Sequence, residues 1–124
     1  MTREKLQERR VSFTVMVNTL SRYLNGSSIA GHISDQMIRS STSAALNYAE
    51  ALGAESRKDF IHKIKVVLKE LRETEISLRI IQSNKICKGE ERLSQCIQEN
   101  NELISIFWKT METAQKNLSQ SHNT

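Results

Sequence analysis

The chain has 124 residues, no proline, four glycines and two cysteines, and its formal net charge at pH 7 is +4. This length suits a single domain, and the lack of proline favours long uninterrupted helices over a turn-rich β fold. The chain has no apolar run of the roughly 18 residues that span a membrane and no apolar signal segment, so we expect a cytoplasmic location.

Four helices are predicted in chain order, at about residues 3–24, 30–52, 56–84 and 91–118, and together they form one domain, 1–124. The Asn-Gly-Ser-Ser cluster at 25–28 ends the first helix, because such residues favour turns. Gly53 ends the second, since glycine takes a positive φ without a Cβ penalty. Ser56 is the expected N-cap of the third helix.

Apolar and small residues recur at helical spacing, so each helix is expected to bury one face. In the first two helices these positions are Leu6, Phe13, Val17, Leu20, Leu24, Ile33, Met37, Ser41, Ala44, Ala45, Tyr48 and Leu52. In the last two they are Phe60, Ile64, Val67, Leu68, Leu71, Thr74, Leu78, Ile81, Leu93, Ile97, Asn100, Ile104, Phe107, Met111, Ala114 and Leu118. Because short loops join long helices, the predicted fold class is all-α, an antiparallel up-down four-helix bundle. A chain this short gains from assembly, so we expect an oligomer.

The second helix carries six small residues in succession, from Ser40 to Ala45. Small side chains let another helix approach closely, so we expect a neighbour to cross the second helix at this turn. That neighbour could be another helix of the same bundle or a helix of a second subunit, and the sequence leaves both interpretations open.

A stripe of polar residues also follows the second helix and has counterparts on the third. If the two helices run antiparallel, Arg39 lies opposite Glu70, Asn47 lies opposite Lys63, and Glu50 lies near the start of the third helix. We predict an Arg39–Glu70 ion pair that fixes the register of the two helices. The alternative is a surface ion pair, which contributes only about 0–1 kcal/mol.

Residues 36–81 resemble the signature region of the bacterial 23S rRNA intervening-sequence protein family. The positions that match its recurring pattern are Gln36, Arg39, Ser40, Thr42, Ser43, Asn47, Tyr48, Glu50, Ala51, Ser56, Asp59, Phe60, Ile61, Lys63, Leu68, Lys69, Glu70, Glu73, Thr74 and Leu78. The chain departs from the pattern at Ser41, where the family has glycine, and at Ser77, where it has an aromatic residue.

The resemblance implies a four-helix bundle that assembles into a ring-like homopentamer and has no established catalytic activity. Members are encoded within intervening sequences of ribosomal RNA genes. Relatives act as accessory proteins of retroelements, where a basic pentamer associates with a reverse transcriptase and nucleic acid. The resemblance therefore implies a homo-oligomer with RNA, DNA or a reverse transcriptase as its partner.

Basic residues line one face of the third helix at spacings of three, four and seven residues: Lys58, His62, Lys65, Lys69, Arg72 and Arg79. Such a face can neutralise phosphates, and each contact adds salt-dependent affinity for nucleic acid. The alternative is a solvated outer face without a ligand. A second basic group, at Arg3, Lys5, Arg9 and Arg10, is open to the same two interpretations.

Metal sites, cofactors and catalytic groups have little support in the sequence. His32, His62 and His122 are far apart, and none has a ligand spacing with Cys87 or Cys96, so no metal and no cofactor is expected. No phosphate-binding loop or nucleophile motif is present. The carboxylates of the polar stripe are better explained by structural pairing than by acid–base catalysis, and we expect no enzymatic activity.

The function predicted from the sequence is that of a non-enzymatic, homo-oligomeric accessory protein that binds nucleic acid. The residues expected to contact the RNA or DNA backbone are Lys58, Lys65, Lys69, Arg72 and Arg79. The alternative is a protein-interaction scaffold whose basic face meets an acidic partner. Trp108, next to Phe107, is assigned either to the core or to a contact between subunits.

Overall fold

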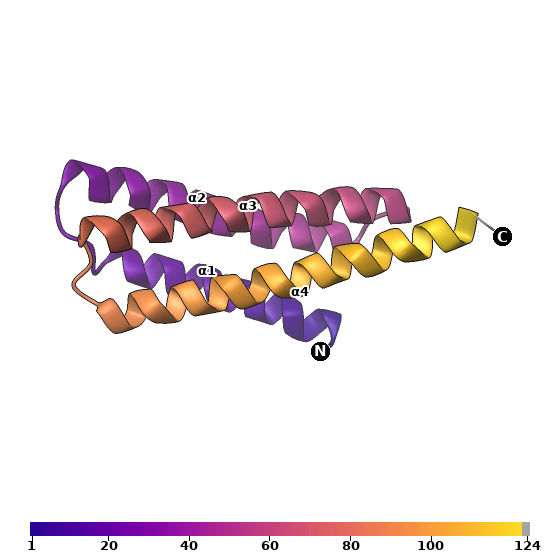
Figure 1. The fold of residues 1–124 in the computed structure, drawn as a ribbon, viewed down its shortest axis with the longest axis horizontal. Helices are drawn as coiled ribbons and strands as arrows, with labels where there is room; N and C mark the ends of the chain where they lie inside the picture. The colour runs from indigo at the N-terminus through magenta and orange to yellow at the C-terminus, as the bar shows by residue number, and fades with distance from the viewer. Residues whose placement is uncertain (123–124) are drawn as a thin grey trace.

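The computed structural model describes residues 1–122, with side chains described up to residue 120, and contains four α-helices (Figure 1). These are α1 (Arg3–Ser21), α2 (Ser28–Leu52), α3 (Arg57–Asn84) and α4 (Glu90–His122). Each helix packs against the next one in the chain, and α1 also packs against α4. The predicted all-α four-helix bundle is confirmed. The chain passes from end to end of the bundle four times, so the two termini lie toward the same end (Figure 1).

The helix ends follow local capping chemistry. Thr2, Ser27 and Ser56 are the N-caps of α1, α2 and α3, and each side-chain oxygen accepts a hydrogen bond from the backbone N–H three residues later. The predicted cap at Ser56 is therefore confirmed. The expected conformation of Gly53 is wrong, because its φ is −98°, and the left-handed residue is Lys85 with a φ of 53°.

Helix α1 ends three residues before the predicted boundary, at Ser21. The segment after it pairs with the loop between α3 and α4 at one end of the bundle. Asn25 N donates to Ile86 O, and Lys88 N donates to Tyr23 O, both over 2.8 Å. This backbone pairing holds the chain in an extended conformation around Leu24. Because that conformation is not helical, α1 cannot continue to residue 24.

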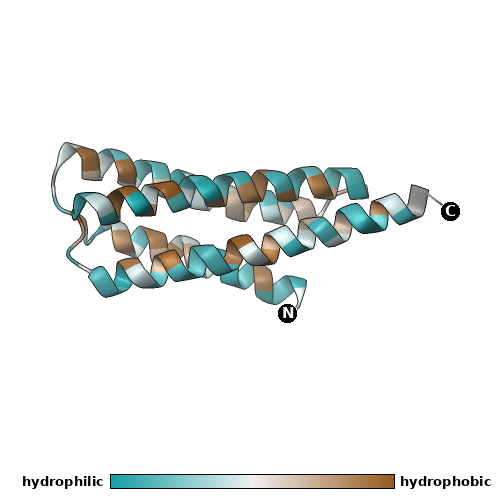
Figure 2. Cartoon of the chain, in the orientation of Figure 1, coloured by the Kyte–Doolittle hydropathy of each residue, from teal (hydrophilic) through white to brown (hydrophobic). Residues whose placement is uncertain are grey.

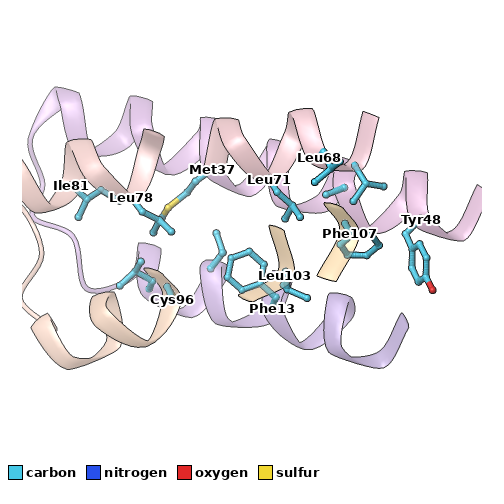
Figure 3. Packing of buried hydrophobic residues seen from close by; sticks show 14 of the residues in the cluster. Phe13, Met37, Tyr48, Leu68, Leu71, Leu78, Ile81, Cys96, Leu103 and Phe107 are labelled. Atoms are coloured by element: carbon cyan, nitrogen blue, oxygen red, sulfur yellow. The ribbon is translucent and has the colours of Figure 1, made fainter. Parts of the chain in front are cut away.

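Buried apolar side chains from all four helices form one continuous core (Figure 3). Hydropathy mapped on the ribbon shows them as separate hydrophobic bands between hydrophilic ones, as expected for helices with one buried face (Figure 2). Tyr48 and Phe107 meet edge to face with their ring centroids 5.0 Å apart. The prediction for α4 is partly wrong, because Cys96 and Leu103 are buried while their neighbours Ile97 and Ile104 are only half-buried. At these two positions the buried residue is one earlier than predicted, whereas Leu93, Asn100 and Phe107 are buried as predicted.

The small residues of α2 accommodate a polar side chain from α1 as well as the close approach of α3. Ser40 and Ser41 are buried, and Ser40 Oγ lies 2.6 Å from Thr74 Oγ1 of α3. Arg10 of α1 is completely buried and donates from Nη2 to Ser41 O over 2.8 Å. The neighbours at this turn are therefore α1 and α3 of the same chain.

Candidate nucleic-acid interface

The basic face of α3 is exposed along most of the helix. Its members Lys58, Lys65, Lys69, Arg72 and Arg79 are all solvent-exposed, and so is His62. None of the five Lys and Arg side chains forms an ion pair within the described part of the chain. At 1.5 Å per residue, the stripe from Lys58 to Arg79 is about 30 Å long. Its charges are therefore available to an external ligand.

Three of these cations border a groove between α3 and α4, which we call the Trp108 groove. It has a volume of about 600 Å³ and is lined by Lys65, Leu68, Lys69, Arg72, Glu73, Ile76, Trp108 and Met111. Trp108 is 47% exposed and Ile76 is 49% exposed, whereas the adjacent Phe107 is fully buried. Trp108 therefore belongs to the surface and not to the core.

The chemistry of the Trp108 groove combines a flat aromatic surface with a positive rim. Its single carboxylate, Glu73, is held by Arg39, whose Nη2 lies 2.6 Å from Glu73 Oε2. The charges of Lys65, Lys69 and Arg72 are therefore not neutralised from within the groove. Such a site can attract phosphates and offer an indole ring to a base or to an apolar side chain.

The polar stripe between α2 and α3 is built around Arg39. Arg39 Nη1 lies 3.3 Å from Glu70 Oε2, so the pair predicted from the register is present, but the shorter contact is with Glu73. The hydrogen bond with Glu73 is the main cause that raises the pKa of Arg39, and the charge of Glu70 adds to it. Burial raises the pKa of Glu70, whose side chain is only 7% exposed. Arg39 therefore only partly compensates for the burial of the Glu70 carboxylate.

Lys63, which was expected opposite Asn47, pairs with Glu50, one of the carboxylates assigned to structural pairing. Lys63 Nζ lies 2.6 Å from Glu50 Oε2, and Asn47 Nδ2 donates to Ser43 O and Oγ on its own helix. The contacts of α2 thus fall about one helical turn further along α3 than expected, because side chains that join two helices need not point straight across. This stripe is a structural seam between α2 and α3.

The second predicted basic group does not form a surface patch. Arg9 is bound by two carboxylates of α4, with Nη2 at 2.7 Å from Glu99 Oε1 and 2.5 Å from Glu102 Oε2. Hydrogen bonding to Glu99 raises the pKa of Arg9. Arg10 lies inside the core, so only Arg3 and Lys5 of this group are exposed. Sequence reasoning missed the burial of Arg10, although its spacing from Leu6 and Phe13 placed it on the apolar face of α1.

The described residues offer little support for other kinds of site. No three His, Cys, Asp or Glu side chains gather there as metal ligands, and His122 lies outside the described side chains. Cys96 is buried, and burial raises its pKa to about 11. None of the described helices is long and apolar enough to cross a bilayer.

Comparisons with known proteins agree with this architecture. The family model described as 23S rRNA-intervening sequence protein matches residues 5–109. A crystal structure of a protein of unknown function from the S23 ribosomal protein family of Bacteroides thetaiotaomicron is similar with a TM-score of 0.78 and 27% identity. The match covers 90% of this chain and 99% of that one. No curated protein matches the chain significantly.

Proposed function

The chain belongs to the 23S rRNA-intervening sequence protein family, and from this premise we propose that it is a non-enzymatic accessory protein that binds nucleic acid. The surface that would bind the RNA or DNA backbone is the exposed face of α3, through Lys58, Lys65, Lys69, Arg72 and Arg79. The proposed context is a complex with ribosomal RNA or a reverse transcriptase in the cytoplasm.

The observation that carries this proposal is the set of five exposed cations, which have no carboxylate partner in the described part of the chain. Three other basic residues, Arg9, Arg39 and Lys63, are held by carboxylates in ion pairs. A stripe about 30 Å long can follow several consecutive phosphates, because double-stranded DNA carries one charge per about 1.7 Å of axis. Binding of this kind reads the backbone and has little sequence preference.

A fluorescence anisotropy titration tests the proposal. Purified protein is added to labelled duplex DNA and to a labelled structured RNA at about 50 and 200 mM salt. We expect saturable binding that weakens at least tenfold over this range, because neutralised phosphates release counterions. The emission of Trp108 reports independently on the site, since it is the only tryptophan and lies beside Lys65, Lys69 and Arg72. Absence of binding at the lower salt concentration would refute the proposal.

We also propose that the protein is a homo-oligomer, with a pentamer as the expected form. Val11 and Val15 on α1 are 51% and 58% exposed, and with Trp108 and Ile76 they leave apolar surface on the isolated chain. Assembly would repeat the α3 stripe on each subunit, so that weak phosphate contacts add by avidity. Native mass spectrometry should give a mass near five times 14.2 kDa, whereas a monomer would contradict assembly.

The lining of the Trp108 groove favours a second candidate function, a scaffold for an acidic protein. Leu68, Ile76, Trp108 and Met111 form an apolar strip, and three cations border it. An amphipathic helix with acidic flanks would match both features. This function predicts that binding of an acidic partner depends on Trp108 and Ile76. It also predicts that the protein purifies free of nucleic acid and does not bind it in the anisotropy titration, which is the opposite of the first proposal.

A further inference from the structure

A cavity of about 480 Å³ lies at the end of the bundle that holds the N-terminus of α1. Its walls come from all four helices and are formed by Met1, Thr2, Arg3, Leu6, Tyr48, Phe60, Ile106, Lys109, Thr110, Thr113, Ala114 and Asn117. It shares no lining residue with the Trp108 groove. Its size lies within the range of about 300–1,000 Å³ that is typical of small-molecule sites.

The cavity has an apolar floor that includes the ring of Tyr48. Leu6 and Tyr48 are buried, and Phe60 and Ile106 are half-buried. The Tyr48 ring packs on Phe107, and its hydroxyl points away from the other labelled core side chains (Figure 3). Tyr48 is 2% exposed overall, and its hydroxyl oxygen is not one of the fully buried polar atoms that lack a hydrogen-bond partner in the described chain. The hydroxyl can therefore donate a hydrogen bond to a ligand in the cavity.

The walls of the cavity carry positive charge. Arg3 stacks over the Phe60 ring with its guanidinium carbon 5.7 Å from the ring centroid, and Lys109 approaches from α4. No carboxylate lines the cavity, although Glu4, next to Arg3, lies near enough to act on Tyr48. Apolar walls and two cations without a lining counter-ion suit a ligand that has an apolar body and an anionic group.

We propose that this cavity binds a small amphiphile that carries one carboxylate or sulfonate on an apolar body. The apolar body packs on Leu6, Phe60 and the edge of Tyr48, and the anion is held by Arg3 and Lys109. The Tyr48 hydroxyl supplies a directional hydrogen bond. This function is separate from nucleic-acid binding, because none of the five cations of the α3 stripe lines the cavity.

The test uses the full-length protein and the fluorescent naphthalene sulfonate 8-anilino-1-naphthalenesulfonate as the probe. We expect saturable binding with one probe per chain. The double change Arg3→Gln and Lys109→Gln should weaken it at least tenfold, and Tyr48→Phe should weaken it severalfold. Ala114→Trp, which fills the cavity, should abolish it. Lys88→Gln, in the loop between α3 and α4, removes the same kind of exposed charge outside both the cavity and the Trp108 groove and should have no effect.

Competition with decanoate and with 1-naphthoate then shows whether the cavity prefers a carboxylate with an aliphatic body or one with an aromatic body. Displacement by either compound supports the cavity as the site. The proposal is overturned if Lys88→Gln reduces probe binding as much as the Arg3 and Lys109 changes do. It is also overturned if Ala114→Trp, folded by circular dichroism, binds the probe with unchanged affinity.

Discussion

Arg10 of α1 donates a hydrogen bond from Nη2 to the main-chain oxygen of Ser41 in α2 over 2.8 Å, in the interior of the bundle. Thr14 Oγ1 lies 3.3 Å from the same oxygen. The guanidinium fits because Ser40 and Ser41 have small side chains, so the run of small residues in α2 makes room for a cation. No carboxylate pairs with it, and its Nε and Nη1 atoms have no hydrogen-bond partner within the described chain.

Replacing Arg10 by methionine should stabilise the protein. Methionine keeps a flexible apolar side chain, although a shorter one, and removes a buried charge, so we expect the free energy of unfolding at pH 7 to rise by about 1–3 kcal/mol. Urea denaturation measures this difference. A loss of more than about 1 kcal/mol would mean that the hydrogen bond to Ser41 outweighs the burial of the charge.

The Arg10 effect should also depend on pH. Burial lowers the pKa of Arg10 from its ordinary value to about 10, so above this pH the unfolded chain binds the Arg10 proton more readily than the folded chain does. Stability therefore rises with pH in this range as the buried charge is lost. The free energies of unfolding of Arg10→Met and of the unchanged protein should therefore become more alike from pH 9 to pH 11. A constant difference would contradict the lowered pKa.

A large side chain at Ser41 should disrupt the packing of α1 on α2. Ser41 is fully buried, and its main chain contacts Arg10. Ser41→Leu would displace the guanidinium, and overpacking of this kind destabilises by about 1–3 kcal/mol or more. Thermal unfolding followed by circular dichroism measures the loss. Ser43→Leu, at a half-buried position of the same turn, is the control and should lower the thermal stability less than Ser41→Leu does.

The contribution of Glu70 to stability should be lost as pH rises. Burial raises the pKa of Glu70, so the folded chain holds this proton more tightly than the unfolded chain. The resulting stabilisation is complete below the unfolded pKa near 4.5 and disappears as pH rises through the folded pKa. At pH 7 the free energy of unfolding of Glu70→Gln should therefore equal that of the unchanged protein or exceed it by up to about 1 kcal/mol. Near pH 4 the variant should have no such advantage. A clear loss at pH 7 would show that the contact with Arg39 dominates.

The two cysteines should differ in reactivity. Cys96 is 2% exposed and burial raises its pKa to about 11, so at pH 8 it is neither accessible nor ionised. Cys87 is half-buried in a loop. An aromatic disulfide reagent at pH 8 should modify one thiol per chain rapidly and the second only after unfolding, and Cys87→Ser should remove the rapid phase. Two rapid phases would contradict the burial of Cys96.

The helices could be predicted because their apolar periodicity and caps are local signals. The buried positions of α4 could not all be predicted. Cys96 and Ile97 are adjacent apolar residues, as are Leu103 and Ile104, and only packing against α1 and α3 selects which residue of each pair is buried. Arg10 escaped prediction because charged residues are almost never fully buried.

The candidate site was predictable in part. The spacing of cations along α3 identified a face that is exposed in the structure. The Trp108 groove could not be predicted, because it requires two helices that meet in a particular rotation. The exact partners of Lys63 and Arg39 depended on the register of α2 and α3, which short-loop geometry fixes only to within about one turn.

Charge reversal on α3 is the sharpest test of whether the α3 stripe binds nucleic acid. The triple change Lys65→Glu, Lys69→Glu and Arg72→Glu should weaken binding of duplex DNA or structured RNA by at least a hundredfold in fluorescence anisotropy at about 100 mM salt, and should flatten the salt dependence. The matched control reverses three other exposed cations, Lys5, Arg22 and Lys88, and alters the net charge equally. We predict a much smaller loss for the control. Equal losses for both variants, or unchanged binding after the α3 change, would contradict the claim.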